Sequence, residues 1–360
     1  MKRVFAFKCL LLVGLLLSVV AVEAKRPTTD TNGDGKLRIL AIGNSFSDDA
    51  MEYLPKFVYQ LGCENVELAR LYIGGCSLER HVREYSQNNA SYQFYHYDYD
   101  SYDPHSDKTH EWKKDSELRT MEYALKMGEW DIITMQQVSG HSGRWDSYQP
   151  HLDELVKIVR KYQPNAKLAW HMTWSYSRNS THGDFKRYDS NQDTMTNAIV
   201  ATARKVYEQT PYFDYLIPSG VAIEALRNTC NNPPMDLTRD GFHLDYGMGR
   251  YAATCVWYKV LIEPFTRKAL KDSEVFTLKG DRFVTTVERA YCITAAERAA
   301  KKPYGVMGKI SPKGMNKSLH SPYIVIDIDR LDDPDYKKQI EASGIKMDLK
   351  KSFSLKKQAR

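Results

Sequence analysis

The sequence has little excess charge of either sign. Among its 360 residues, 51 Lys and Arg stand against 45 Asp and Glu, a formal net charge of +6. Five of the basic residues fall in the last eleven positions, where there is no acid. A short basic run at a chain end is typical of a solvated tail rather than of a nucleic-acid interface. We therefore expect no nucleic acid among the partners of this protein.

Long hydrophobic runs are also scarce, and the only one lies at the N-terminus. Lys2 and Arg3 precede an apolar stretch over residues 9–22, and Val22-Glu23-Ala24 offers a small-residue cleavage site. The stretch is short for a membrane span and has the layout of a secretory signal peptide. We expect residues 1–24 to be removed, which leaves a secreted or periplasmic protein without a membrane span in its mature chain.

Patterns of cysteine and of metal ligands are sparse as well. No Cys-x-x-Cys or His-x-x-x-His spacing suggests zinc. Residues 30–35 are similar to half of a calcium-binding loop, but the twelfth position, which needs a Glu, is Ala41. We expect no metal site. The cysteines beyond the signal segment have no close pair, so we favour buried thiols over disulfides for Cys63, Cys76, Cys230, Cys255 and Cys292.

Short apolar segments alternate with amphipathic ones along most of the remaining chain. We expect helices at 46–61, 77–85, 148–162, 191–209 and 248–262. We expect strands at 37–42, 66–73, 131–135, 166–174 and 213–219. Apolar strands separated by helices indicate a parallel sheet covered on both faces, with active loops at the carboxyl ends of the strands. The predicted fold is an α/β, flavodoxin-like three-layer sandwich with a five-stranded parallel sheet.

Two regions depart from this alternation. A tyrosine-rich insert at about 90–115 is expected to form a hairpin or loop, and the chain becomes irregular after residue 265. In that tail we expect a short strand and a helix over 276–300, and an added strand over 323–328. The predicted organisation is a signal peptide at 1–24, a linker at 25–36, a main domain at 37–265 and a C-terminal extension at 266–360, partly packed on the domain.

The first expected strand ends in Gly43-Asn44-Ser45, which places Ser45 at a strand-to-helix turn. There a hydroxyl can be exposed, and the helix N-terminus can stabilise developing negative charge. Far along the chain the sequence reads Asp240-Gly241-Phe242-His243. This spacing lets Asp240 hold Nδ1 of His243 while Nε2 faces the serine. We infer that Ser45 is a nucleophile, His243 its base and Asp240 the orienting acid.

Ordinary structural roles are open to these residues too. A serine at such a turn often caps the helix, and His243 could be a surface histidine. Asp245 competes with Asp240 as the partner of the imidazole. Asn44 is expected to brace its turn, with substrate contact as a second role. The aromatic side chains of the insert either pack against the domain or stack on sugar rings, with Tyr97 and Trp112 as the candidates for substrate contact.

In their order these pieces resemble the motifs of the SGNH (GDSL-like) hydrolases. Gly43-Asn44-Ser45, Ile73-Gly74-Gly75-Cys76-Ser77 and Asp240-x-x-His243 are similar to that family's first, second and last blocks, over roughly residues 37–262. The nearest subgroup is one of secreted bacterial proteins defined as a domain of unknown function. The resemblance implies a catalytic domain at 37–265, with an oxyanion hole built on the backbone amides of Ser45 and Gly75.

The sequence departs from the family at the third block. Most members have Gly-x-Asn-Asp after the third strand, and the Asn side chain completes the oxyanion hole. Here the strand ends Gln136-Gln137-Val138-Ser139-Gly140. A glutamine carries the same amide donor on a longer stem. We therefore expect Gln137 or Gln136 to supply the third donor, and favour Gln137 because it lies one position further out of the strand.

Together these inferences predict a secreted serine esterase that needs no cofactor. Export, the aromatic insert and the resemblance favour a carbohydrate O-acetylesterase, acting on an acylated glycan or another small ester. A lipid esterase or thioesterase is the alternative with the same chemistry, and it should show an apolar acyl tunnel. A catalytically degenerate glycan-binding domain is the alternative of another class, and the missing Asn favours it. The sequence leaves the acyl group and the oligomeric state open.

Overall fold

The computed structural model describes residues 29–98, 111–231, 236–270 and 286–305, together with residues 284, 310, 323–324 and 334. The expected signal peptide, the first part of the linker, the strand expected near residue 276 and most of the tail lie outside these described residues. Among the described residues, no helix has the length and apolar character that a membrane crossing requires.

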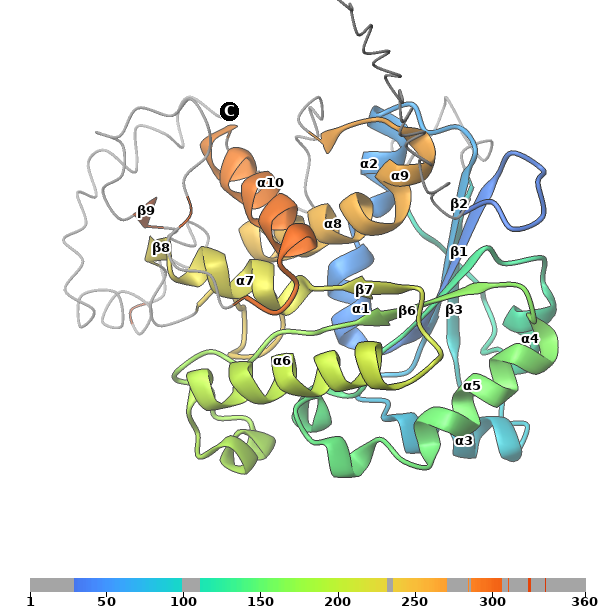
Figure 1. Cartoon of the computed structure of the whole chain (residues 1–360), viewed down its shortest axis with the longest axis horizontal. Helices are drawn as coiled ribbons and strands as arrows, with labels where there is room; N and C mark the ends of the chain where they lie inside the picture. The colour runs from blue at the N-terminus through green and yellow to red at the C-terminus, as the bar shows by residue number, and fades with distance from the viewer. Residues whose placement is uncertain are drawn as a thin grey trace, which may run out of the picture.

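A seven-stranded sheet forms the middle layer of the fold, in the order β4-β3-β2-β1-β5-β6-β7 (Figure 1). The central strand β1 (Leu37–Gly43) pairs in parallel with β2 (Val66–Tyr72) and with β5 (Ile132–Met135). The parallel pairing continues to β6 (Lys167–His171) and β7 (Tyr215–Ile217). These five strands follow the 2-1-3-4-5 order of a flavodoxin-like sheet. The predicted fold class is confirmed, with two further strands at one edge.

The two additional strands come from the tyrosine-rich insert. β3 (Gln93–Tyr97) pairs antiparallel with β2, and β4 (Lys113–Lys114) pairs antiparallel with β3. Tyr92 and Phe94 are fully buried, and Tyr97 is 3% exposed. The described part of the insert is therefore packed into the domain as an extension of the sheet.

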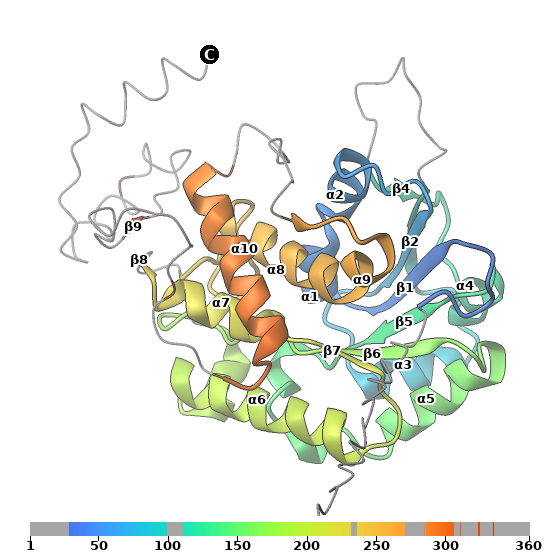
Figure 2. The same cartoon turned by 45° about the horizontal axis from the view of Figure 1, so that its top comes forward.

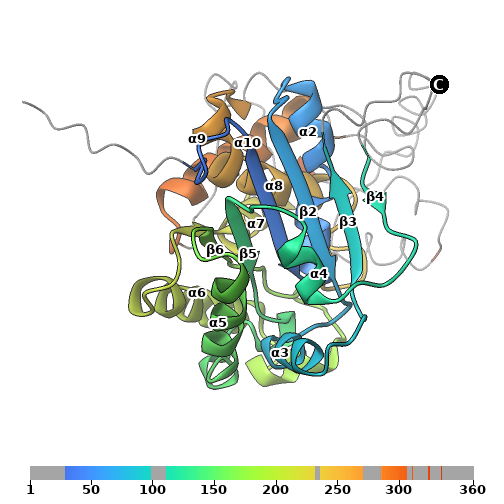
Figure 3. The ribbon, with the colours of Figure 1, turned by 90° about the vertical axis from the view of Figure 1, so that its right-hand side faces the viewer.

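Helices cover both faces of the sheet, and Figures 1 and 2 show the two layers. One layer contains α3 (Leu78–Ser86), α4 (Met121–Lys126), α5 (His151–Tyr162) and α6 (Gln192–Gln209). The other contains α1 (Ser45–Met51), α2 (Leu54–Gln60), α7 (Ser219–Arg227) and α8 (Met248–Trp257). A π-helical turn, Tyr258–Ile262, continues α8 into α9 (Glu263–Thr266). Seen from the side of β3 and β4, the sheet stands between the layers (Figure 3).

The helix expected at 46–61 is divided in two. α1 ends at Met51, and α2 begins at Leu54 with Pro55 in its first turn. Proline has no N–H and fits the start of a helix, so the second helix begins there instead of continuing the first. In the tail, α10 (Thr286–Lys301) packs against α7 and α8, and β9 (Tyr323–Ile324) pairs with β8 (Cys230–Asn231).

The core lies on both sides of β1, whose residues Ile39, Leu40, Ala41 and Ile42 are at most 1% exposed. A central parallel strand is buried on both faces and therefore reads as a continuous apolar run. Four cysteines are free and buried within the described part of the chain, as expected of small apolar side chains: Cys63, Cys76, Cys255 and Cys292.

Candidate active site

Ser45 is the first residue of α1, directly after the end of β1. Asn44 caps this helix with an extended backbone, and its side-chain oxygen accepts a hydrogen bond of 3.0 Å from the amide of Phe46. The short polar sequence after the apolar strand thus ends β1 and starts α1 within two residues. The Ser45 hydroxyl is thereby held at the N-terminal, electropositive end of the helix.

The structure brings together the three residues of the expected triad. The Ser45 hydroxyl lies 2.8 Å from Nε2 of His243, and Nδ1 of His243 lies 2.6 Å from Oδ2 of Asp240. Oδ1 of Asp240 accepts from the backbone amides of His243 and Phe242, at 2.8 and 3.2 Å. The carboxylate therefore fixes both the ring and the backbone of His243, with the ring proton on Nδ1 and Nε2 open to the serine.

The charge on Asp240 is stabilised by the same contacts. Burial acts to raise the pKa of this carboxyl, but hydrogen bonds from the ring and amide of His243 and from the amide of Phe242, together with the electrostatic attraction of the imidazole, outweigh it. The pKa of Asp240 consequently lies below its ordinary value, so the group is ionised at neutral pH. Asp245, the competing candidate, instead accepts from the amides of Gly247 and Gly249, each at 2.9 Å, in the turn that opens α8.

Gly75 lies beside Ser45 in the wall of the same pocket. Its φ is +60°, a left-handed conformation that glycine adopts without steric cost, and no atom lies within 4 Å of the position a Cβ would take. Within the described residues, the backbone N–H groups of Ser45 and Gly75 have no acceptor among the hydrogen bonds of the fold. Two backbone donors are thus available on residues that line the same pocket as the Ser45 hydroxyl.

The expectation that Gln137 or Gln136 completes an oxyanion hole is corrected by the structure, because neither lines the pocket. Gln137 accepts from the amide of Leu78 at 3.0 Å, and its Nε2 donates to the carbonyl of Ser147 at 3.0 Å. Gln136 donates through Nε2 to Oδ1 of Asn44 at 2.8 Å. Both glutamines are 1% exposed and use their amides to join loops within the fold.

Gln136 belongs to a buried chain of hydrogen bonds beneath Ser45, which the sequence did not reveal. His171 Nδ1 lies 2.6 Å from Oε1 of Gln136, and its Nε2 lies 3.0 Å from the Ser219 hydroxyl. Asn44 extends the chain by donating through Nδ2 to the carbonyl of Cys76 at 2.9 Å. Burial lowers the pKa of His171 to about 3, so the ring is neutral and donates from Nδ1 to Gln136. The turn holding Ser45 is thereby tied to the loop of Gly75.

Of the residues considered for substrate contact, only Asn44 lines the pocket, and its side-chain bonds brace the turn. Tyr97 lies in the core instead. Trp112 donates through Nε1 to the carbonyl of Met51 at 3.3 Å, and the Arg70 guanidinium lies 4.4 Å from its ring centroid. The expectation of substrate contact through Tyr97 and Trp112 is therefore corrected, since both contribute to packing.

A second buried group, Asp49, connects α1 to the loop of His243. Its Oδ2 accepts from the amide of Leu244 at 2.8 Å. Its Oδ1 accepts from Arg239 at 2.9 Å and from Nε of Arg250 at 2.8 Å. Asp49 is fully buried and lies one helical turn after Ser45. This cluster ties the element that carries the serine to the loop that carries the histidine.

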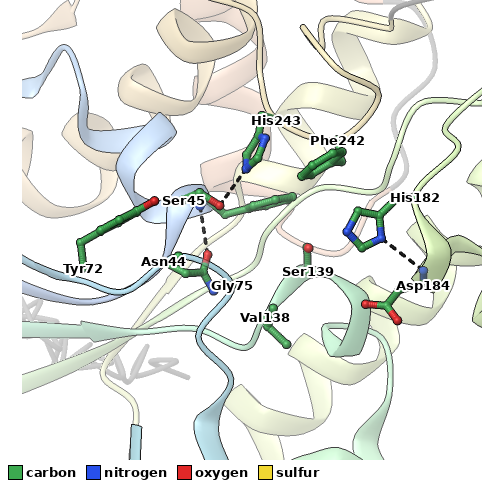
Figure 4. A pocket seen from close by; sticks show the side chains of 12 residues that line it. Asn44, Ser45, Tyr72, Gly75, Val138, Ser139, His182, Asp184, Phe242 and His243 are labelled. Atoms are coloured by element: carbon green, nitrogen blue, oxygen red, sulfur yellow. Dashed lines mark hydrogen bonds between the residues drawn. The ribbon is translucent and has the colours of Figure 1, made fainter. Parts of the chain in front are cut away.

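The pocket in front of Ser45 has a volume of about 340 Å³, and Figure 4 shows the side chains around it. Ser45 and His243 lie toward one side in this view, and His182 and Asp184 lie toward the other. Phe46, Phe242 and Val138 supply apolar surface. In the described residues, no group of three or more His, Cys, Asp or Glu side chains is arranged to hold a metal ion.

Fold and site together resemble those of the SGNH hydrolases: a flavodoxin-like sheet carries Ser45, Asp240 and His243 in the order along the chain that the motifs predicted. The chain belongs to the DUF4886 family, a domain of unknown function whose model matches residues 38–288. The predicted membership of a family defined as a domain of unknown function is thus confirmed. The crystal structure of a DUF4886 family protein from Bacteroides uniformis has 33% sequence identity and a TM-score of 0.63, and the match covers 76% of this chain and 97% of that one.

Two further solved structures are less similar. A protein from Slackia heliotrinireducens, provisionally named an SGNH hydrolase, is 18% identical over 58% of this chain and 91% of its own, with a TM-score of 0.37. A protein from Parabacteroides merdae, provisionally named a GDSL-like lipase, is 12% identical, with a TM-score of 0.39, and the match covers 62% of this chain and 94% of that one. Similarity at this level says nothing about the activity of this chain. No curated protein matches it.

Proposed function

We propose that this protein is a serine esterase. The observation that carries the proposal is the continuous hydrogen-bonded line from Asp240 through His243 to the Ser45 hydroxyl, which ends at an open pocket. A serine hydroxyl is a weak nucleophile until a base removes its proton, and an oriented imidazole at 2.8 Å is such a base.

In the proposed reaction, the Ser45 oxygen attacks the ester carbonyl while His243 Nε2 takes the hydroxyl proton. The negative charge of the tetrahedral intermediate develops on the carbonyl oxygen, where the amides of Ser45 and Gly75 donate hydrogen bonds to it. His243 then gives the proton to the departing alcohol, which leaves an acyl group on Ser45. Water, deprotonated by the same imidazole, attacks this acyl-enzyme and releases the acid.

The proposed substrate is an acetylated carbohydrate, and the proposed location is outside the cytoplasm, following the signal peptide expected at residues 1–24. The pocket supports a small acyl group with a polar alcohol portion, since it has a volume of about 340 Å³ and carries Ser139, His182 and Asp184 in its wall. A long lipid chain would place methylene groups against these polar side chains, which is unfavourable. Amino-terminal sequencing of the exported protein tests the cleavage after Ala24.

The experiment for the reaction compares the wild-type protein with Ser45→Ala on p-nitrophenyl acetate, together with fluorophosphonate labelling. Loss of the nucleophile should lower kcat by about a thousandfold or more and abolish labelling. Ser47→Ala is the matched control, because this neighbouring hydroxyl donates to the Asn44 carbonyl at 2.8 Å and lies outside the pocket lining. Equal turnover by wild type and Ser45→Ala would refute the assignment of the nucleophile.

A catalytically degenerate glycan-binding domain is the second candidate. The observation that favours it is the engagement of both third-block glutamines inside the fold, which leaves two backbone donors for an oxyanion. One missing oxyanion donor typically lowers kcat by roughly a hundredfold to a thousandfold. Failure of the wild-type protein to react with fluorophosphonate, with retained binding of acetylated glycans, would establish this alternative.

A further inference from the structure

Asp184 is a carboxylate of the pocket wall that the proposed reaction does not use. It lies in the 3-10 helix Gly183–Tyr188, and its side chain is 32% exposed. Oδ1 pairs with Nε of Arg187 at 2.8 Å, whereas Oδ2 has no hydrogen-bond donor among the residues that the structure describes. Figure 4 shows the carboxylate on the side of the pocket away from Ser45 and His243. An acceptor oxygen is thus left for a ligand.

The position of this carboxylate is built into the neighbouring loop. A Cβ on Gly140 would lie 2.1 Å from Oδ2 and 2.5 Å from Cγ of Asp184, so only glycine lets the carboxylate occupy this place. Gly140 belongs to the 3-10 helix Ser139–His141, and Ser139 also lines the pocket. The glycine at the end of the third block therefore makes room for an acid from a distant part of the chain.

His182 complements this acceptor with a donor. Its Nδ1 accepts a hydrogen bond of 3.2 Å from the amide of Asp184, so the proton of the neutral ring lies on Nε2. The His182 ring packs edge-on against Phe242, with centroids 4.7 Å apart, and Phe242 in turn lies 4.1 Å from the His243 ring. An aromatic surface thus extends from the catalytic histidine to the pair formed by His182 and Asp184.

We propose that Asp184, with His182 and Phe242, forms a subsite for an uncharged, hydroxyl-bearing ring in the alcohol portion of the ester. This inference rests on the proposed esterase function and deepens it. A sugar ring offers one apolar face to an aromatic side chain and hydroxyl groups at its edge for a carboxylate and an imidazole N–H. An anionic ring, such as a uronate, is disfavoured because its charge would approach Asp184.

The test uses two esters that differ only at C6, which is a hydroxymethyl group in methyl 2-O-acetyl-glucoside and a carboxylate in methyl 2-O-acetyl-glucuronide. The wild-type protein should prefer the neutral ester by about tenfold in kcat/KM at low salt, and added salt should reduce this ratio because the site is partly exposed. Asp184→Asn should bring the ratio to about one or below, because Arg187 then keeps its charge without its partner. Gly140→Ala should also lower it, because the new methyl group displaces the carboxylate without removing it.

Asp146→Asn is the matched control. This carboxylate is 70% exposed, pairs with Arg144 and lies outside the pocket lining, so its removal should leave the ratio unchanged. An equal ratio in wild type and Asp184→Asn, or a wild-type preference for the glucuronide, overturns the subsite.

Failure of the subsite and failure of the esterase proposal remain distinguishable. If p-nitrophenyl acetate is hydrolysed in a Ser45-dependent way but the ratio does not respond to Asp184, the reaction stands and the subsite falls. If neither sugar ester is hydrolysed, calorimetric binding of both to Ser45→Ala measures the same charge preference without turnover. Tighter binding of the glucoside, lost in the double variant with Asp184→Asn, supports the subsite, and equal binding overturns it.

Discussion

Removing the Asp49 carboxylate should both destabilise the protein strongly and lower the activity of the site at Ser45. Asp49 is fully buried, and Asp49→Ala would leave the Arg250 guanidinium, itself 5% exposed, and the Leu244 amide without this acceptor. Breaking a buried ion pair by deleting one partner costs about 3–5 kcal/mol in the free energy of unfolding. In a domain of this size each kcal/mol lowers Tm by roughly 2–4 °C, so Tm should fall by about 6–20 °C.

The turnover of p-nitrophenyl acetate by Asp49→Ala, measured well below its Tm, should also fall, because Leu244 adjoins His243 and loses its link to α1. Asp49→Asn keeps an oxygen for the Leu244 amide and loses the charge, so its kcat should lie between those of Asp49→Ala and the wild type. Such rescue separates positioning of His243 from a general loss of stability.

Asp48→Ala is the control for this prediction. Asp48 precedes Asp49 in the same helix, its side chain is 27% exposed, and its partner Arg70 retains Glu52 at 3.3 Å. A partly exposed pair of this kind contributes about 1 kcal/mol or less, so Tm should fall by at most about 2–4 °C. Thermal unfolding followed by circular dichroism gives both values. If the two variants melted at the same temperature, the reasoning from burial would be refuted.

The remaining predictions concern the groups around the serine. Asp240→Asn should lower kcat by about 10⁴-fold, because the amide favours the wrong tautomer of the His243 imidazole, whereas Asp245→Asn should mainly lower Tm. Steady-state kinetics and thermal unfolding measure the two effects, and a larger loss of kcat in Asp245→Asn than in Asp240→Asn would contradict the assignment. Gln136→Met should lower kcat by about tenfold with KM little changed, because the Asn44 turn loses its brace, and an unaltered kcat would contradict this role. His171 is buried with a pKa lowered to about 3, so the unfolded chain binds more protons between about pH 6.5 and pH 3 and acid erodes stability across that window. In His171→Asn the free energy of unfolding should decrease less steeply with falling pH, by up to about 1.4 kcal/mol per pH unit. Denaturant titrations at several pH values measure this dependence, and the same dependence on pH in both proteins would refute the prediction.

The pattern of apolar segments was sufficient to predict the parallel sheet, because buried central strands such as β1 read as unbroken apolar runs. The break between α1 and α2 could have been predicted from Pro55, but the apolar spacing across residues 46–61 is nearly continuous and concealed it. α7 was missed for another reason. All nine of its residues are buried, including Glu224 and Arg227, so its polar residues do not mark a solvent-facing side by which the sequence could be recognised as an amphipathic helix.

The Ser45, His243 and Asp240 arrangement was predictable because the positions of short motifs at strand ends and their spacing determine it. The role of Gln136 and Gln137 could not be predicted in this way, because a side-chain amide at the end of a strand can point either into the pocket or into the interior of the fold. The decision depends on His171 and Ser147, which come from other parts of the chain and supply partners for Gln136 and Gln137. Likewise, Asp184 shows no motif in the sequence, because it gains its place only through Gly140, far away along the chain.

The antiparallel strands of the insert also determine where the sheet stops. Without them β2, seven residues long, would present its unpaired backbone groups as a template on which a strand from another molecule could form. With them, the outermost strand on that side, among the residues that the structure describes, is β4, which consists of the two exposed residues Lys113 and Lys114. Two molecules that approached through this edge would bring four ammonium groups together over a very short ladder. Edge-to-edge pairing of two copies through β2 is thereby disfavoured.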